Sequence, residues 1–99
     1  LRPVHVGALF AAVERYQVAS LDLQYNQLGA AGGELVAAAL KTNTTLTTLS
    51  LYSNNLGPAG GVAVVEALKG NTALTSLNLY NNNLGPAGGM AGWHGARRG

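Results

Sequence analysis

The chain has 99 residues, of which 47% are hydrophobic and 10% are charged, and it carries a formal net charge of +2. This composition excludes an intrinsically disordered chain, which combines few apolar residues with high charge, and the absence of cysteine excludes disulfides and cysteine-based zinc sites. The basic residues are scattered, with only Arg97 and Arg98 adjacent, so we expect no nucleic-acid partner, because nucleic-acid recognition needs a basic stripe.

The first predicted element is a helix in the stretch VGALFAAVERY, which starts at Val6 and is expected to pack beneath the first strand. Its uninterrupted apolar run, from Val6 to Val13, is much shorter than the roughly 20 residues that cross a bilayer. No cleavage pattern of a signal peptide follows this run. We therefore expect no membrane partner and a cytoplasmic location, which the absence of cysteine also fits.

A repeated phrase dominates the rest of the chain. It reads LDLQYNQLG from Leu21, LSLYSNNLG from Leu49 and LNLYNNNLG from Leu77, so the copies start 28 residues apart (49 − 21 = 28 and 77 − 49 = 28). The alternation of apolar and polar residues in each phrase predicts a strand with one buried face. The stretch that follows, such as GVAVVEALK from Gly61, has apolar residues at 64, 65 and 68 and predicts a helix.

The motif NNLGPAGG, which occurs twice, links a predicted strand to its helix. A phosphate-binding loop would carry lysine followed by serine or threonine after its glycines, and neither copy does. We therefore interpret the motif as structural. Gly57 and Gly85 are expected to adopt positive φ, and Pro58 and Pro86 to take the first helical position, which needs no backbone donor. Gly60 is expected to let its helix lie close to the neighbouring one.

The segment before each of the two later strands repeats as well, as KTNTTL from Lys41 and KGNTAL from Lys69 (69 − 41 = 28). In the first copy, Asn43-Thr44-Thr45 matches the glycosylation sequon. Such matches are common by chance and matter only in a secreted chain, so we interpret this one as incidental.

The pattern L-x-x-L-x-L-x-x-N-x-L resembles the leucine-rich repeat family, and the wording LGPAGG…VVEALKGNTALTSLNL resembles its ribonuclease-inhibitor-like and NOD-like-receptor-type repeats. The resemblance covers about residues 18–89. It implies an α/β solenoid, a short right-handed arc with a parallel sheet on the concave face and helices on the convex face. We expect one domain over residues 1–99, divided into an N-terminal helix or partial repeat, three repeats and a degenerate tail: 1–17, 18–45, 46–73, 74–89 and 90–99.

One asparagine recurs in every copy, at Asn26, Asn54 and Asn82. The resemblance implies that these residues form a ladder whose amides bond the backbone of adjacent repeats. Buried backbone in a tight turn must find hydrogen-bond partners, and asparagine both donates and accepts, so there is an independent physical reason for this role. We expect the three residues to be structural and not catalytic.

The polar residues of each predicted strand are expected to face the open concave side, in columns of one residue per repeat. The columns are Ser20, Thr48 and Ser76; Asp22, Ser50 and Asn78; Gln24, Tyr52 and Tyr80; and, at the rim, Tyr25, Ser53 and Asn81. The candidate partner-binding residues among them are Asp22, Gln24, Tyr25, Ser50, Tyr52, Asn78 and Tyr80. Tyrosine gives a large contact area at low entropic cost, so Tyr52 and Tyr80 are the expected anchors. The competing interpretation is an ordinary solvated strand surface, because tyrosine is favoured in strands.

These features predict a non-catalytic module that binds another protein and uses no cofactor. The alternative is a regulatory scaffold, either an activator of a small GTPase or an innate-immune-type sensor. An activator would need a functional arginine or asparagine on a loop at the concave rim; Arg15 lies before the first strand, and nothing marks it out. We expect no catalytic residue and no metal site, since His5 and His94 have no partner at ligand spacing. Glu34 and Glu66 are expected to face solvent.

The phasing of the repeat decays at both ends of the chain. After Gly89 the expected next helix fails, because glycine stands at positions 92 and 95. Solenoids need polar capping repeats, and open sheet edges invite pairing. We therefore expect either a fragment of a longer repeat array or a chain that associates with itself through its open sheet edges.

Overall fold

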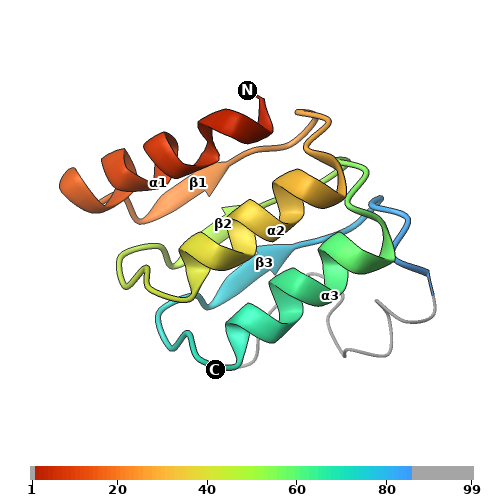
Figure 1. Cartoon of the computed structure of the whole chain (residues 1–99). Coiled ribbons are helices and arrows are strands. Elements are labelled where there is room, and N and C mark those ends of the chain that lie inside the picture. Colours follow the sequence, from red (N-terminus) through yellow and green to blue (C-terminus); the bar gives the residue numbers. More distant parts are fainter. Residues whose placement is uncertain (1, 86–99) are drawn as a thin grey trace.

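The computed structural model describes residues 2–85, in which helices and strands alternate along the chain (Figure 1). A short 3-10 helix, η1 (Pro3–His5), leads into α1 (Val6–Arg15). The remaining elements are β1 (Ser20–Asp22), α2 (Gly29–Leu40), β2 (Thr48–Ser50), α3 (Gly57–Leu68) and β3 (Ser76–Asn78). The predictions for Pro86, His94 and the tail 90–99 fall outside the described residues.

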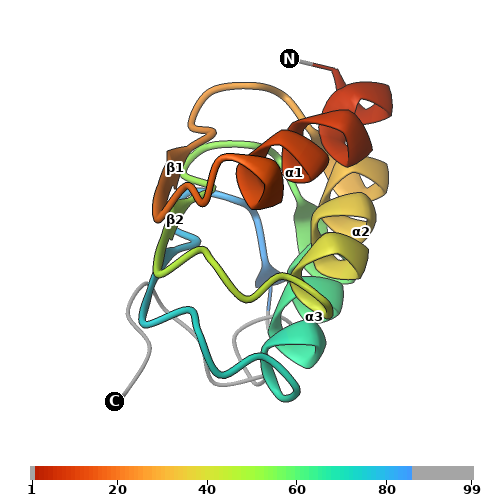
Figure 2. The same ribbon diagram turned by 90° about the vertical axis from the view of Figure 1, so that its left-hand side faces the viewer.

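The three strands form one parallel sheet in the order β1-β2-β3. Partners in neighbouring strands are 28 residues apart, as in Leu21, Leu49 and Leu77 (49 − 21 = 28 and 77 − 49 = 28). Parallel neighbours need a crossover connection, and α2 and α3 supply it. Figure 2 shows the strands on one side of the molecule and the helices on the other, which confirms the predicted α/β solenoid architecture.

The core lies between the strands and the helices and consists mainly of leucine. In the second repeat the leucines of the predicted pattern are all buried: Leu46, Leu49, Leu51 and Leu56. Burying one such side chain stabilises the fold by about 1.5–3 kcal/mol. Leu84 differs from the prediction, because it is only half-buried while its equivalent Leu56 is fully buried. It lies at the outer edge of the stack, beyond β3.

Glycine permits two features of the turn between strand and helix. Gly57 adopts a φ of 68° and Gly85 a φ of 65°, as predicted. Gly60 and Gly33 allow a close approach of two helices. A Cβ at Gly60 would lie 3.3 Å from the Cα of Ala30, and a Cβ at Gly33 would lie 3.0 Å from the Cα of Gly60. The paired glycines therefore set how closely the starts of α2 and α3 pack.

The N-terminal helix departs from the repeat. The sequence predicts that it packs beneath the first strand. The backbone of α1 lies beside α2 in the helix layer (Figure 1), and its buried side chains belong to the same core as Leu23, with Leu21 of β1 packed against it. Its buried residues are Val6, Phe10 and Val13. Residues 16–19 connect α1 to β1, and the longer segment 41–47 connects α2 to β2. The helix layer therefore contains one more helix at the N-terminal end, and a shorter segment connects this helix to its strand.

Candidate functional site

The exposed side of the sheet carries polar side chains in the expected columns. Ser20, Thr48 and Ser76 pair in register across the three strands, and all three are exposed. We name this surface the strand face; it comprises residues 20, 22, 24 and 25 and their equivalents in the second and third repeats. The described side chains therefore form a continuous surface over three neighbouring strands.

The second column of the strand face has a structural task in addition to its exposure. The Oδ1 atom of Asp22 accepts a hydrogen bond of 3.0 Å from the backbone N–H of Gln24. Asn78 does the same for Tyr80 at 2.9 Å, and Ser50 does so through its hydroxyl in the second repeat. Each of these predicted binding residues thus closes the turn that follows its own strand, and Gln24 lies exposed beside the first of them.

Tyr25 and Tyr52 form an aromatic pair on the strand face. Their ring centroids are 5.4 Å apart and the planes meet at 90°, the edge-to-face arrangement that aromatic rings favour. A side-chain hydrogen bond with Tyr52, followed by the electrostatic effect of that group, raises the pKa of Tyr25. Tyr25 is 65% exposed, so a partner can reach its ring. The contact runs across the predicted columns, in which Tyr52 was aligned with Gln24 and Tyr80.

The turn that holds Tyr25 has a left-handed backbone that the sequence analysis did not predict. Tyr25 has a φ of 60°, and its equivalents Ser53 and Asn81 have φ values of 57° and 60°. Gln27, with a φ of 52°, shares this region with its equivalents, Asn55 and Asn83. Asparagine tolerates this region, and a bulky aromatic residue rarely adopts it. The run of asparagines at 81–83 is the feature of the sequence that could have indicated a left-handed turn.

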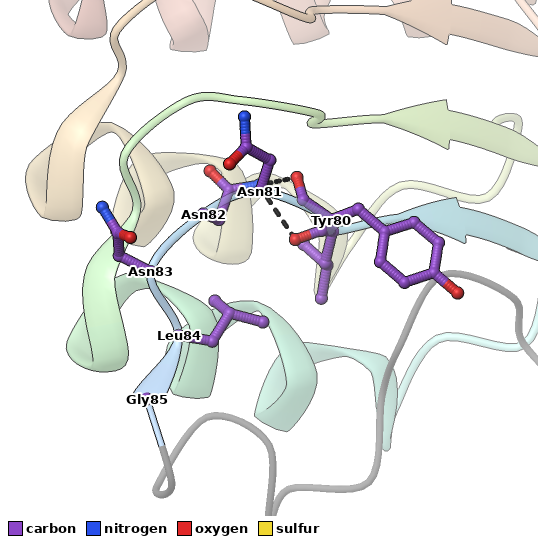
Figure 3. Close-up of a pocket in the computed structure, with 7 residues that line it drawn as sticks. Tyr80, Asn81, Asn82, Asn83, Leu84 and Gly85 are labelled. Atoms are coloured by element: carbon purple, nitrogen blue, oxygen red, sulfur yellow. Dashed lines mark hydrogen bonds between the residues drawn. The ribbon is translucent and has the colours of Figure 1, made fainter.

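Tyr80 extends the strand face at the outer edge of the sheet. It is 55% exposed, and its side chain points away from Asn83 and Leu84 (Figure 3). It also borders a cavity of about 330 Å³ that is lined by residues 79–85. The cavity is uncharged and lies at the turn that follows β3, so it is separate from the Tyr25–Tyr52 pair.

Asn54 and Asn82 join the repeats through their side-chain amides. The Oδ1 atom of Asn54 accepts from the backbone N–H of Asn26 at 2.9 Å, and its Nδ2 donates to the carbonyl of Leu23 at 2.8 Å. Asn82 bonds Asn54 and Leu51 in the same way, each at 2.8 Å. The Nδ2 of Asn26 donates to the carbonyls of its own turn. These asparagines therefore hold backbone together and do not face a ligand.

A second pair of asparagines has a similar role that the sequence analysis missed. Asn43 and Asn71 are each only 3% exposed. The Nδ2 of Asn71 donates to the carbonyls of Leu40 and Asn43, at 2.8 and 3.1 Å. Its Oδ1 accepts from two backbone N–H groups before β3. Because Asn43 is buried, its match to the glycosylation sequon is explained by its structural role. The recurrence of asparagine in KTNTTL and KGNTAL is the feature of the sequence that could have indicated this role.

Charged groups contribute little to the strand face. Asp22 is its one charged residue within the described chain. The ion pair of Glu66 with Lys69, at 3.1 Å, lies exposed at the end of α3, and Glu34 and His5 are also exposed. Among residues 2–85, no three histidine or carboxylate side chains gather where they could hold a metal ion. In the same part of the chain, no helix has the length and apolar character needed to cross a membrane.

Comparison with known proteins agrees with this repeat geometry. A family model described as Leucine Rich repeat matches three stretches of the chain, residues 19–37, 42–65 and 70–91. Each of the first two stretches begins shortly before a strand and runs into the helix that follows it, and together the three cover more than half of the sequence. No curated protein matches the chain.

Proposed function

The chain belongs to the leucine-rich repeat family, and on this premise we propose that it binds another protein through its strand face and catalyses no reaction. Leucine-rich repeats are generally protein-interaction modules. The strand face suits this task, because it is a continuous exposed surface of hydroxyl, amide and phenol groups. Such groups combine contact area with adaptable hydrogen bonding in recognition surfaces.

The pair of the exposed Tyr25 and the half-buried Tyr52 is the observation that carries this proposal. A residue other than glycine in the left-handed region costs about 1–3 kcal/mol, and such residues gather at functional sites. Tyr25 bears this cost at a φ of 60° while 65% of it remains exposed. Burial in the core therefore does not account for a tyrosine here, and contact with a partner would account for it.

The charge of the strand face defines the chemistry of the partner. Asp22 is the one charged residue on it within the described chain. We propose a partner surface that is neutral or weakly basic and that offers hydrogen-bonding groups to the hydroxyl and amide columns. Capture of a strongly basic enzyme is not part of the proposal, because it would need a strongly acidic face.

We also propose that the repeats are of the ribonuclease-inhibitor-like type with a period of 28 residues. Two observations support this assignment. Paired strand residues are 28 apart, as in Leu49 and Leu77 (77 − 49 = 28), and α2 and α3 are each 12 residues long. The regulatory alternatives have less support: Arg15 lies at the end of α1 with its guanidinium 5.5 Å from the ring centroid of Tyr16, away from the strand face.

The experiment that tests the proposal is partner capture with a matched pair of arginine substitutions. Thr48→Arg places a long cation in the middle of the strand face, and Ala38→Arg places the same residue on α2; both positions are exposed. The partner captured by the full chain is identified and its affinity for each variant is measured. We expect Thr48→Arg to weaken binding about tenfold or more and Ala38→Arg to leave it unchanged. Equal affinities for the two variants would rule out the strand face.

The aromatic anchors are tested separately by replacing Tyr52 and Tyr80 together with alanine. Truncating a true anchor costs more than about 1 kcal/mol of binding free energy. We therefore expect a clear loss of affinity for the captured partner, while circular dichroism shows a retained fold. An intact affinity would mean that the tyrosines are ordinary strand residues.

A further inference from the structure

We propose that the outer edge of the last described repeat binds an extended segment of a second polypeptide that carries the pattern Leu-x-Leu-x-x-Asn-x-Leu. The segment would add a parallel strand next to β3, and its asparagine would enter the cavity lined by residues 79–85. This edge site borders the strand face at Tyr80 and Asn81, but the proposal does not depend on the strand face having a partner.

The two joints within the chain show what such an edge recognises. At the first joint, the Oδ1 atom of Asn54 accepts from the N–H groups of Asn26 and Leu28, at 2.9 and 3.4 Å. At the second joint, Asn82 accepts from Asn54 and Leu56, at 2.8 and 3.3 Å. In both joints the incoming asparagine bonds two backbone donors that lie two residues apart.

The incoming asparagine also donates in each joint. Its Nδ2 bonds the carbonyl of Leu23 at the first joint and that of Leu51 at the second, in both cases at 2.8 Å. The equivalent groups of the third repeat are the carbonyl of Leu79 and the N–H groups of Asn82 and Leu84. All three residues line the cavity, in which a further asparagine would make the same three kinds of bond.

The backbone of the third turn already has the conformation that the joints require. Asn81, Asn83 and Gly85 have φ values of 60°, 52° and 65°. The values in the second turn, which does receive an asparagine, are 57°, 56° and 68°. Because the two sets agree within a few degrees, a segment that docks here meets donors and acceptors that are already oriented, and this lowers the entropic cost of binding.

The cavity is large enough to admit a side chain of this kind, and it is uncharged. Its volume of about 330 Å³ lies at the lower end of the range of about 300–1,000 Å³ for ligand clefts. Figure 3 shows the Nδ2 of Asn82 bonded to the carbonyls of Leu79 and Tyr80, so the side chain of Asn82 is held to its own turn. None of the lining residues is charged, so the amide of the incoming asparagine, and not an ionic group, provides the selectivity.

The outer edge is also continuous with an interface inside the chain. β3 already pairs with β2 in parallel register on its other side. Among the described strands, β1 and β3 are the two edge strands, and an edge strand presents a row of backbone groups that another strand can pair with. Strand addition of this type obtains affinity from the backbone and specificity from the side-chain pockets.

The test is a titration of the isotopically labelled full chain with a blocked peptide of residues 74–85, LTSLNLYNNNLG. The matched control peptide carries Asn82→Ala and is otherwise identical. We expect saturable shifts of the backbone amide signals of Leu79, Asn82 and Leu84, with the Ser20 and Leu21 signals at the other sheet edge unchanged. The control peptide should bind about tenfold more weakly, since it lacks the two or three hydrogen bonds of the amide.

Three results would overturn the proposal. They are a dissociation constant weaker than about 1 mM, equal affinities of the two peptides, and shifts confined to strand-face signals away from the cavity, such as those of Ser20 and Thr48. Concentration-dependent shifts of Leu79, Asn82 and Leu84 without peptide would support the proposal and identify a second copy of the chain as the source of the segment.

Discussion

The turn after β1 and the turn after β2 follow nearly the same backbone path but carry different side chains. Both have three left-handed residues in alternate positions. In the second turn these are Ser53, Asn55 and Gly57, and in the first turn they are Tyr25, Gln27 and Gly29. Glycine adopts this backbone freely and asparagine tolerates it, whereas serine, tyrosine and glutamine adopt it at a cost, so the first turn has two such residues and the second has one. The first turn therefore gives up local stability and exposes a tyrosine.

The connections that precede the strands also differ between the first repeat and the later repeats, and again the first repeat has fewer stabilising contacts. Before β3, Asn71 bonds the connection of the preceding repeat through its amide. Before β1 the equivalent position is occupied by Arg15 (71 − 28 = 43 and 43 − 28 = 15), at the end of α1. Buried asparagine side chains thus form hydrogen bonds between the inner repeats, and the first repeat has fewer such hydrogen bonds. Sites that break the local rules of a fold are often functional sites.

The largest effect is expected from breaking an inner joint. Asn54→Leu removes the partner of the N–H groups of Asn26 and Leu28 and of the carbonyl of Leu23. We expect a loss of about 1–3 kcal/mol in the free energy of unfolding, because buried backbone groups lose their hydrogen bonds. Urea unfolding measures it. The comparison is Asn26→Leu in the first repeat, where the asparagine is only half-buried. If Asn26→Leu lowered the free energy of unfolding as much as Asn54→Leu, the proposed difference in stability between the first and the inner repeats would be wrong.

The same substitution should have opposite effects in an inner helix and in the N-terminal helix. At Gly33 a Cβ would lie 3.0 Å from the Cα of Gly60, so Gly33→Ala should destabilise the fold by about 1 kcal/mol through overpacking. At Gly7 in α1 nothing lies within 4 Å of a Cβ, so Gly7→Ala should stabilise by about 0.5–1 kcal/mol. Thermal melts of both variants check the signs. A stabilising Gly33→Ala would mean that the helices are not in close contact.

A smaller gain is expected from giving the first turn an inner-repeat residue. Gln27 has a φ of 52°, and its equivalents Asn55 and Asn83 are linked by a hydrogen bond of 3.2 Å between their side chains. Gln27→Asn should stabilise the fold by about 0.5 kcal/mol, because asparagine tolerates the left-handed region better. The unfolding midpoint in urea measures the gain. Asn55→Gln is the reverse change, and it should lower the midpoint by a similar amount.

The smallest effect concerns the ionisation of the aromatic pair. A hydrogen bond with Tyr52 raises the pKa of Tyr25, so its phenol should ionise above the ordinary value of about 10. The sign follows from linkage: the stabilising contribution is present below the unfolded pKa and is lost as the pH rises through the folded pKa. An NMR titration follows the ring signals. Tyr52→Phe removes the hydroxyl, and an unaltered Tyr25 titration in that variant would contradict this cause.

The sequence predicts the stack of repeats well because the stack depends on periodic features. Leucines at fixed spacing bury one face of each strand, and Gly57 and Gly85 mark the turns, so strand register and helix positions follow from the period. Pro58 lies in the first turn of α3, but it is the second residue of the helix and not the first, which is the position that the sequence predicted. These features repeat three times, and repetition separates a structural pattern from chance.

The contact between Tyr25 and Tyr52 could not be predicted in the same way. It joins two different positions of the repeat, so the period does not indicate it; it depends on the left-handed backbone at Tyr25. The role of Asn43 was missed for another reason. A sequon and a buried capping asparagine have the same letters, and only burial distinguishes them.

We propose that, in the first turn, a tyrosine that lowers local stability is retained because it binds the partner, and one measurement tests this directly. Tyr25→Asn and Gln27→Asn both place asparagine at a left-handed position of that turn, but only the first removes an exposed ring. The measurement is the affinity of the captured partner for each variant. The account predicts that Tyr25→Asn binds about tenfold more weakly, with its fold retained, and that Gln27→Asn binds as the unaltered chain does. An unchanged affinity of Tyr25→Asn would contradict it.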